Sequence, residues 1–232
     1  MKSRMRSSAV LLCLALGWAA SAQAAEPGWY LVGFGGQSSA SSLNKSQTDD
    51  NLVAIFEFVG LDVADITSTL DDSDTAFGLG GGYQLNDHFA FEFSYVDLGS
   101  VDYQAAATVS DGVDEADAEV GLESSANGAV LSALGILPVG DRFSVFGRVG
   151  FSLMSAKGTA RITLNGVSDR LSQDSQKSDP VLGIGAEYSL GRHFAVRLAW
   201  DRYFDVGTED VTGDVDADLY SLGFRMGVDW FR

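Results

Sequence analysis

Residues 219–231 read Leu-Tyr-Ser-Leu-Gly-Phe-Arg-Met-Gly-Val-Asp-Trp-Phe. From Tyr220 to Trp230 every second residue is apolar or aromatic, and the residues between them are small or charged. Successive side chains of a β-strand point to opposite faces, so one face of this segment is apolar and the other is polar. At about 3.3 Å per residue and a tilt near 40°, Tyr220 and Trp230 stand about 25 Å apart along a membrane normal. The stretch therefore predicts a strand that crosses a membrane.

A short turn motif occurs three times between apolar segments. Its copies are Asn86-Asp87-His88-Phe89-Ala90-Phe91, Gly140-Asp141-Arg142-Phe143-Ser144-Val145 and Gly191-Arg192-His193-Phe194-Ala195-Val196. Each copy follows a glycine-rich apolar strand and leads into another alternating segment, which predicts three β-hairpins. An opening strand at 29–36 and a closing strand at 219–231 raise the count to eight, an even number that lets the two ends of the sheet meet.

Four longer connections, at 39–74, 99–121, 158–178 and 207–218, contain 21 of the 32 acidic residues. Short turns at one end and long loops at the other are typical of outer-membrane barrels, whose long loops are extracellular. The sequence therefore predicts an all-β protein, an eight-stranded antiparallel transmembrane up-and-down β-barrel. Residues 52–59 are too apolar for a free loop. We expect them to extend strands above the membrane or to pack as a short helix over the barrel mouth.

The N-terminus has the three parts of a signal peptide: basic residues, an apolar run at 9–20 and a small-residue triplet at 22–24. We expect cleavage after Ala24, which assigns 1–24 to the signal peptide and 25–232 to the barrel. The mature chain then has 12 basic and 32 acidic residues, a net charge of −20 that disfavours nucleic acid as a partner. Because the single cysteine lies at position 13, the mature chain is not stabilised by disulfides.

Four ionisable residues alternate with large apolar residues within the expected strands: Glu92, Arg148, Glu187 and Arg197. A soluble β-sandwich or lipocalin-like barrel would also alternate. However, these charges share a face with glycines while the other face carries Phe, Leu, Tyr or Trp, which favours a membrane barrel with a charged lumen. Glu92 and Arg197 each lie four residues after the histidine of their turn motif, so we expect them at one depth. Buried charges need partners, and we expect the four residues to form an interior salt-bridge cluster.

Aromatic residues recur where the expected strands meet the membrane–water interfaces, as in the girdles of outer-membrane barrels. The predicted girdle consists of Tyr83, Phe89, Phe143, Tyr188, Phe194, Tyr220 and Trp230.

Several stretches of these strands resemble the transmembrane domain of the OmpA family. They are Gly82-Tyr83-Gln84-Leu85-Asn86, Phe91-Glu92, Arg148-Val149-Gly150, Pro180-Val181, Gly185-Ala186-Glu187-Tyr188, Arg197-Leu198 and Ser221-Leu222-Gly223. The resemblance implies a location in the bacterial cell outer membrane, contact with its lipid and lipopolysaccharide, and insertion by the barrel-assembly machinery. It also implies that the interior cluster acts as a gate and that Ala133 replaces an interior lysine of the family.

The resemblance does not extend to the peptidoglycan-binding domain of OmpA, because the chain stops at Arg232. Tethering to the cell wall is therefore not implied. The terminal aromatic that the assembly machinery reads in this family corresponds to Phe231, one residue before the end, and the sequence leaves open whether Arg232 weakens assembly.

Together these features predict a structural and surface-interaction protein of the outer membrane with, at most, a narrow pore gated by the interior cluster. Two alternatives stay open: a channel for small hydrophobic molecules similar to OmpW, and a lipid-modifying outer-membrane enzyme. We do not expect an enzyme, because His88 and His193, the only histidines, lie beside short turns and no nucleophile motif occurs. We expect no cofactor, and the sequence leaves the oligomeric state open.

Asp214, Asp216 and Asp218 form a weak candidate for a divalent metal site. An EF-hand loop would need glycine and glutamate where Leu219 and Arg225 stand. We therefore favour a solvated acidic loop here and expect no metal.

Overall fold

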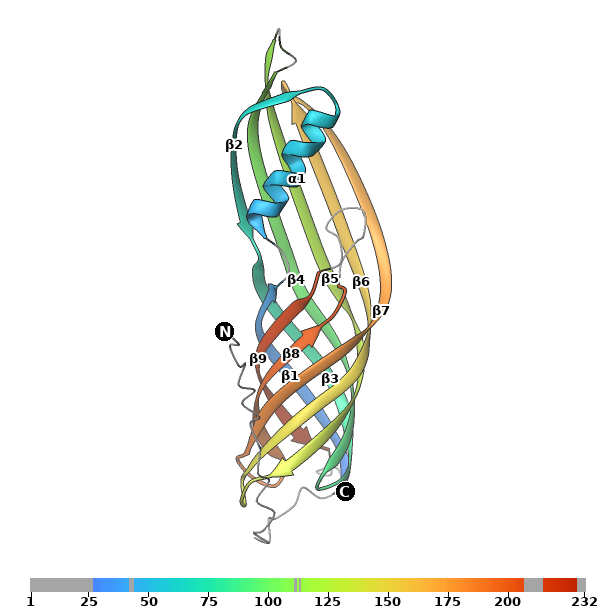
Figure 1. Cartoon of the computed structure of the whole chain (residues 1–232). Helices are drawn as coiled ribbons and strands as arrows, with labels where there is room; N and C mark the ends of the chain where they lie inside the picture. The colour runs from blue at the N-terminus through green and yellow to red at the C-terminus, as the bar shows by residue number, and fades with distance from the viewer. Residues whose placement is uncertain (1–26, 42–43, 111, 113, 207–214, 229–232) are drawn as a thin grey trace, which may run out of the picture.

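The computed structural model describes residues 27–41, 44–110, 112, 114–206 and 215–228. Within them it has nine β-strands and one α-helix (Figure 1). Their bounds are β1 Gly28–Ala40, α1 Lys45–Phe58, β2 Asp62–Asp71, β3 Ser73–Asn86, β4 Phe89–Ser110, β5 Glu115–Pro138, β6 Phe143–Leu164, β7 Val167–Ser189, β8 Phe194–Tyr203 and β9 Ala217–Gly227. The predicted signal peptide lies outside the described residues.

Eight of the strands close into an antiparallel ring in the order β1-β3-β4-β5-β6-β7-β8-β9. The ring closes where β1 pairs with β9, from Tyr30 opposite Gly227 to Ala40 opposite Ala217. A membrane interior offers no water to backbone N–H and C=O groups, so a ring without free edges satisfies all of them. The three turn motifs connect β3 to β4, β5 to β6 and β7 to β8. The predicted eight-stranded up-and-down barrel is confirmed.

The outer wall of the barrel is apolar over a limited height. On β6 the outward positions from Phe143 to Leu153 are apolar or glycine, and the next two are Ser155 and Lys157. Phe143 and Leu153 are ten residue steps apart, which is about 25 Å along the normal, the height of a transmembrane apolar band. Trp230 lies outside the described residues. The other predicted girdle residues are all exposed on the outer wall: Tyr83, Phe89, Phe143, Tyr188, Phe194 and Tyr220.

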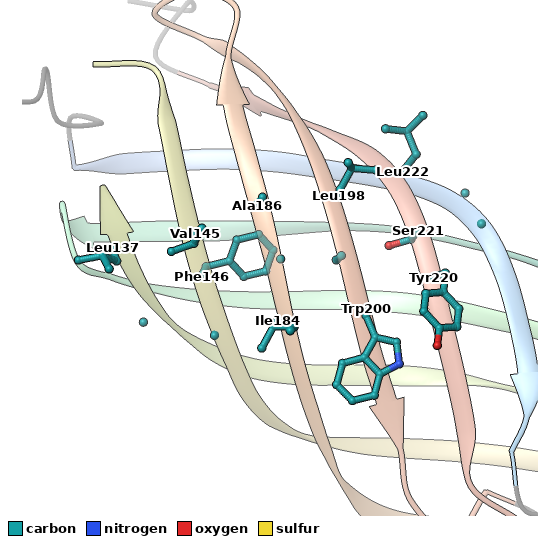
Figure 2. Close-up of a pocket in the computed structure, with 16 residues that line it drawn as sticks. Leu137, Val145, Phe146, Ile184, Ala186, Leu198, Trp200, Tyr220, Ser221 and Leu222 are labelled. Carbon is teal, nitrogen blue, oxygen red and sulfur yellow. The ribbon is translucent and has the colours of Figure 1, made fainter. Parts of the chain in front are cut away.

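A shallow apolar groove of about 910 Å³ crosses the outer wall over β5 to β9 and β1 (Figure 2). Exposed leucine and isoleucine side chains on neighbouring strands line it, among them Leu137, Ile184, Leu198 and Leu222. Because the groove lies within the apolar band, we expect lipid acyl chains to fill it.

Four strands of the ring, β4 to β7, continue beyond the apolar band and rise above the barrel with β2 (Figure 1). We call this five-stranded sheet the extension. β2 pairs only with the upper half of β4, from Asp62 opposite Ser110 to Asp71 opposite Asp102. The extension thus has open edges, unlike the ring.

The extension corrects the predicted loops at 99–121 and 158–178, which are mostly strand. β4 ends only at Ser110 and β5 begins at Glu115, while β6 and β7 are joined by Asn165 and Gly166 alone. These two turn residues have φ of 46° and 80°. Positive φ at both central residues is the requirement of a type I′ turn, which Asn-Gly meets most easily. A tight hairpin therefore replaces the expected loop.

α1 packs on one face of the extension, so residues 52–58 belong to a helix with Val59 as its C-cap, and residues 62–71 extend the sheet. Phe56 is buried against alanine and valine side chains of β4 and β5. The Asp49 carboxylate accepts hydrogen bonds of 2.5 Å from the Ser68 and Tyr103 hydroxyls. Burial raises the pKa of Asp49, but these hydrogen bonds and Lys45 outweigh it and lower the pKa overall. Among the described residues no helix is long and apolar enough to cross a membrane.

Because the outer wall of the barrel faces lipid, we expect arginine to lower the free energy of unfolding by different amounts at two equally exposed isoleucines. Ile184 is 61% exposed within the apolar band and Ile55 is 60% exposed on α1. Ile184→Arg should reduce the free energy of unfolding in lipid vesicles by about 2 to 4 kcal/mol, because it places a charge in hydrocarbon. Ile55→Arg should change it by less than about 0.5 kcal/mol. Equal effects would show that Ile184 does not face lipid.

Candidate functional site

Glu92 of β4 is the centre of an ion-pair network inside the barrel. One carboxylate oxygen, Oε1, accepts a hydrogen bond from Arg197 Nη1 at 2.6 Å, and Oε2 accepts one from Arg148 Nη2 at 2.8 Å. The Tyr30 hydroxyl donates a third, 3.0 Å long, to Oε1. Glu92 is only 3% exposed, and both arginines are 8% exposed. A carboxylate this deeply buried is stable only with such compensation.

The network continues from Glu92 in both directions along the barrel. Towards the extension, Arg148 Nη1 contacts both carboxylate oxygens of Asp201 at 2.8 Å. Towards the short turns, Arg197 pairs with Glu187 at 2.9 Å, and Glu187 pairs with Arg225 at 3.1 Å. Three carboxylates thus alternate with three guanidinium groups, and the network is neutral as a whole.

Strand register brings these side chains to the inner wall. Glu187 lies opposite Arg197 on the neighbouring strand, so the two point to the same side of the sheet. Glycines provide the space that the large side chains need. A Cβ atom at Gly183 would overlap the Asp201 carboxylate, and one at Gly82 would overlap the Tyr30 ring that reaches Glu92. Alanine at either glycine would therefore displace a member of the network.

The lumen is closed at the network and again above it. The cavities beside the network measure about 10 Å³, next to Glu92 and Arg148, and about 60 Å³, next to Arg225. The smaller one holds a single water at most. The Arg197 guanidinium also lies 4.7 Å from the centre of the Phe146 ring. On the side of the extension a buried apolar layer follows, which includes Val96, Leu98, Val130, Met154, Val181, Tyr203 and Leu219.

The structure brings together all four residues expected in the interior cluster and adds two that the sequence analysis missed. Asp201 lies four residues after Arg197 on the same strand, hence on the same face. Arg225 lies on the polar face of the final strand. Alternation alone could have placed both in the lumen. The positions of these two side chains along the barrel axis could not be derived from alternation, because they depend on the stagger between neighbouring strands.

The expectation that Ala133 faces the lumen is wrong. Ser132 lies opposite Glu92 and is buried, whereas Ala133 lies opposite Phe91 of the outer wall. A shift of one residue along a strand exchanges its two faces. An error of one residue in aligning this strand with the family therefore assigned an outer-wall residue to the lumen.

The structure does not test the weak metal site completely, because Asp214 lies outside the described residues. Asp218 forms an ion pair with Arg202 at 2.6 Å and accepts a hydrogen bond from Trp200. Asp216 accepts one from the backbone N–H of Asp205 at 3.3 Å. Within the part of the chain that the structure describes, no three His, Cys, Asp or Glu side chains are grouped so as to hold a metal ion.

A closed antiparallel ring with an apolar belt and a charged, packed lumen defines a small β-barrel of the outer membrane. The family model described as the OmpA-like transmembrane domain matches residues 24–228. The chain belongs to this family, and it is located in the bacterial outer membrane.

Two curated proteins and one solved structure are similar to this chain. Outer membrane protein A of Serratia marcescens is 28% identical over 151 residues, which cover 64% of this chain and 38% of that protein. Outer membrane protein A of Escherichia fergusonii is 27% identical over 229 residues, which cover 96% of this chain and 56% of that protein. The chain thus spans about two fifths to three fifths of these relatives. The N-terminal β-barrel of Pseudomonas aeruginosa OprF has a TM-score of 0.44 at 12% identity, with coverage of 87% of this chain and 98% of that chain.

The alternating network predicts that two substitutions compensate each other. Glu92→Gln or Arg197→Met alone leaves an unbalanced buried charge and should reduce the free energy of unfolding by about 3 to 5 kcal/mol. The double variant leaves two neutral pairs, Arg148 with Asp201 and Glu187 with Arg225, so it should recover part of this loss. Urea titration in lipid vesicles measures all three variants.

Arg202→Met provides the control for this cycle. This substitution also removes an ion pair, but the Arg202 side chain is 34% exposed, so the loss of stability should be much smaller than that of either single variant in the network. If the effects of Glu92→Gln and Arg197→Met simply add, the two residues are not coupled.

Proposed function

We propose that this protein is a structural and surface-interaction barrel of the outer membrane that passes, at most, ions along a narrow path gated by the network. The observation that carries this proposal is the closed lumen. Buried ion pairs fill it at one level, and an apolar layer fills it at the next. Close charges and apolar constrictions are both means by which pores are gated. A path for ions would require the side chains of both layers to move.

The extension is the second support for the proposal. Outer-membrane barrels have short turns on the periplasmic side and their long connections outside the cell. The tall, acidic extension would then be displayed on the cell surface, where it can meet other molecules. Lipid and lipopolysaccharide surround the outer wall in this arrangement, and the barrel-assembly machinery inserts the chain.

The two alternative functions have less support. An apolar groove of about 910 Å³ lies on the outer wall, whereas the cavities beside the network in the lumen measure about 10 Å³ and 60 Å³, which does not favour a channel for hydrophobic molecules. Uptake of apolar solutes into liposomes that contain the protein would establish that alternative. Hydrolysis or transfer of acyl chains from lipid A would establish the enzyme alternative.

Conductance across a planar lipid bilayer tests the closed lumen. The refolded residues 25–232 should give no steady current, or only brief openings of small size. The double variant Glu92→Gln with Arg197→Met keeps neutral pairs but loses the central one, so it should open more often than the wild type. Arg202→Met should behave as the wild type. A large steady current through the wild type would contradict the proposal, and equal currents in all variants would reduce the network to a structural plug.

Labelling of intact cells tests the orientation. Ser172, on the part of β7 within the extension, and Asp141, in the β5–β6 turn, are both exposed. We expect a membrane-impermeant maleimide to label Ser172→Cys on intact cells and Asp141→Cys only after lysis. The opposite result would invert the orientation.

A further inference from the structure

β2 forms an open edge of the extension. It pairs with β4 on one side and, within the part of the chain that the structure describes, with no strand on the other side. Figure 1 shows β2 at the margin of the sheet. The N–H and C=O groups on the free side of such a strand can pair with another extended chain. A further strand can therefore be added beside β2.

The extension has a second open edge in the upper part of β7, but charges protect it. Five charged residues are distributed along the part of β7 that pairs only with β6: Asp169, Arg170, Asp174, Lys177 and Asp179. In β2 a bulge between Val63 and Asp65 interrupts the upper end, but residues 66–70 pair regularly and contain no charge, proline or glycine. Charges, prolines and bulges are the features that prevent edge pairing. Residues 66–70 lack all three, and we call them the β2 edge.

The side chains of the β2 edge alternate between the two faces of the sheet. Residues directly opposite each other in an antiparallel pair point to the same side. Ser68 lies opposite Ala105, and Ala105 lies opposite Val120, which belongs to the apolar cluster beneath α1. Ile66, Ser68 and Leu70 are therefore on the face that carries α1, where Ile66 and Leu70 are half-buried. The two threonines between them point to the opposite face, which continues the outer wall of the barrel.

This outer face is strongly acidic next to the β2 edge. By the same register, all acidic residues of β2 and of the upper parts of β4 and β5 point away from α1: Asp62, Asp65, Asp71, Asp102, Glu115, Asp117, Glu119 and Glu123. The strands β2, β4 and β5 contain no lysine or arginine. The basic residues of this face, Lys157, Arg161 and Arg170, lie on β6 and β7, towards the far edge of the sheet.

Three of these carboxylates form a row that ends at the open edge. Asp71 of β2 lies opposite Asp102 of β4, and Asp102 lies opposite Glu123 of β5. Burial, Glu123 and Asp71 together raise the pKa of Asp102. Like charges directly opposite each other destabilise a sheet, and opposite charges stabilise it. A basic side chain placed beside Asp71 on a further strand would therefore reduce the repulsion within the row.

The two faces define which strand would fit. The side chains of an added strand would also alternate between the faces. Those on the side of α1 would lie beside Ile66 and Leu70, where apolar residues extend the cluster beneath the helix. Those on the outer face would lie beside Thr67, Thr69 and Asp71, where basic residues meet the acidic face. The geometry favours an extended segment in which apolar and basic residues alternate.

A second copy of this chain fits the β2 edge poorly. Copies in one membrane have the same orientation, so their β2 strands would run parallel, and parallel pairing is slightly less stable per residue. Pairing in register would also bring Asp65 beside Asp65 and Asp71 beside Asp71, which repel each other. We therefore expect a different molecule at this edge.

We propose that the β2 edge binds an extended segment of another protein, in which apolar and basic residues alternate, as a further strand of the extension. Backbone hydrogen bonds hold the segment, and the acidic outer face selects basic side chains. The inference rests on the proposed function only in requiring that the extension faces outwards, which the labelling of Ser172→Cys measures separately. Peptide binding to the purified barrel does not depend on orientation, so the two proposals can fail independently.

Binding of defined peptides tests the β2 edge. The probe is a fluorescent ten-residue peptide of alternating arginine and valine, added to the refolded barrel in phosphatidylcholine nanodiscs, with empty nanodiscs as the blank. Fluorescence anisotropy should show saturable binding that weakens as salt is added, because salt screens the charges. The same peptide with every backbone nitrogen methylated keeps its charges but has no N–H donors, so it should bind at least about tenfold more weakly. A peptide of alternating glutamate and valine should not bind.

Variants locate the site. Thr67→Lys combined with Thr69→Lys adds two charges to the outer face of the β2 edge, where they should repel the basic side chains and raise the Kd at least about tenfold. Ser168→Lys combined with Ser172→Lys is the matched control, because it adds the same charge to the outer face at the β7 edge, and it should leave the Kd unchanged. All four positions are exposed, so folding should persist, and the heat-dependent gel mobility of the barrel verifies it.

Three outcomes would overturn the proposal. Equal binding of the methylated peptide would mean that charge alone attracts the probe. Equal Kd values for the two double lysine variants would place the binding site elsewhere. Self-association of the wild type that the Thr67→Lys and Thr69→Lys pair abolishes in sedimentation experiments would make a second copy of the chain the occupant of the edge.

Discussion

The rest of the structure depends on the requirement that every backbone N–H and C=O group in hydrocarbon has a hydrogen-bond partner within the protein. The pairing of β1 with β9 meets it by removing the last two edges of the sheet. Closure then fixes an inner and an outer wall, and alternation along each strand assigns side chains to one or the other. Apolar residues face lipid for the height of the bilayer, and the charged residues of the same strands are confined to a narrow lumen.

Confinement explains the composition of the network. A lumen this small cannot hydrate ions, so each charge needs an opposite charge at contact distance, and Glu92 has two guanidinium partners. Alternation of three carboxylates with three guanidinium groups satisfies this need along the barrel axis. Glycines on the inner wall, such as Gly183, leave room for it. The same packing that makes the charges tolerable also closes the lumen at the level of the network.

Above the bilayer the requirement for closure no longer holds, because water satisfies free backbone groups. Only β4 to β7 continue there, joined by β2, and the sheet has open edges. One of its faces is apolar without lipid to cover it. α1 covers part of that face through Phe56 and is held at its N-terminal half by the hydrogen bonds of Asp49. On the remainder of that face, apolar side chains of β6 and β7 such as Val167 and Leu171 stay exposed.

The sequence by itself determined the two walls of the barrel, the three short hairpins and four members of the network, because these follow from alternation and turn residues, which are local. It also contained the Asn165-Gly166 signal of the tall hairpin, within the segment 158–178 that the sequence analysis assigned to a loop. Only the tertiary structure decided the depth of Asp201 and Arg225, the exchange of Ala133 for Ser132 in the lumen, and the partial cover by α1. Depth and register follow from the stagger that ring closure imposes on all strands together, and no single segment of the sequence contains it.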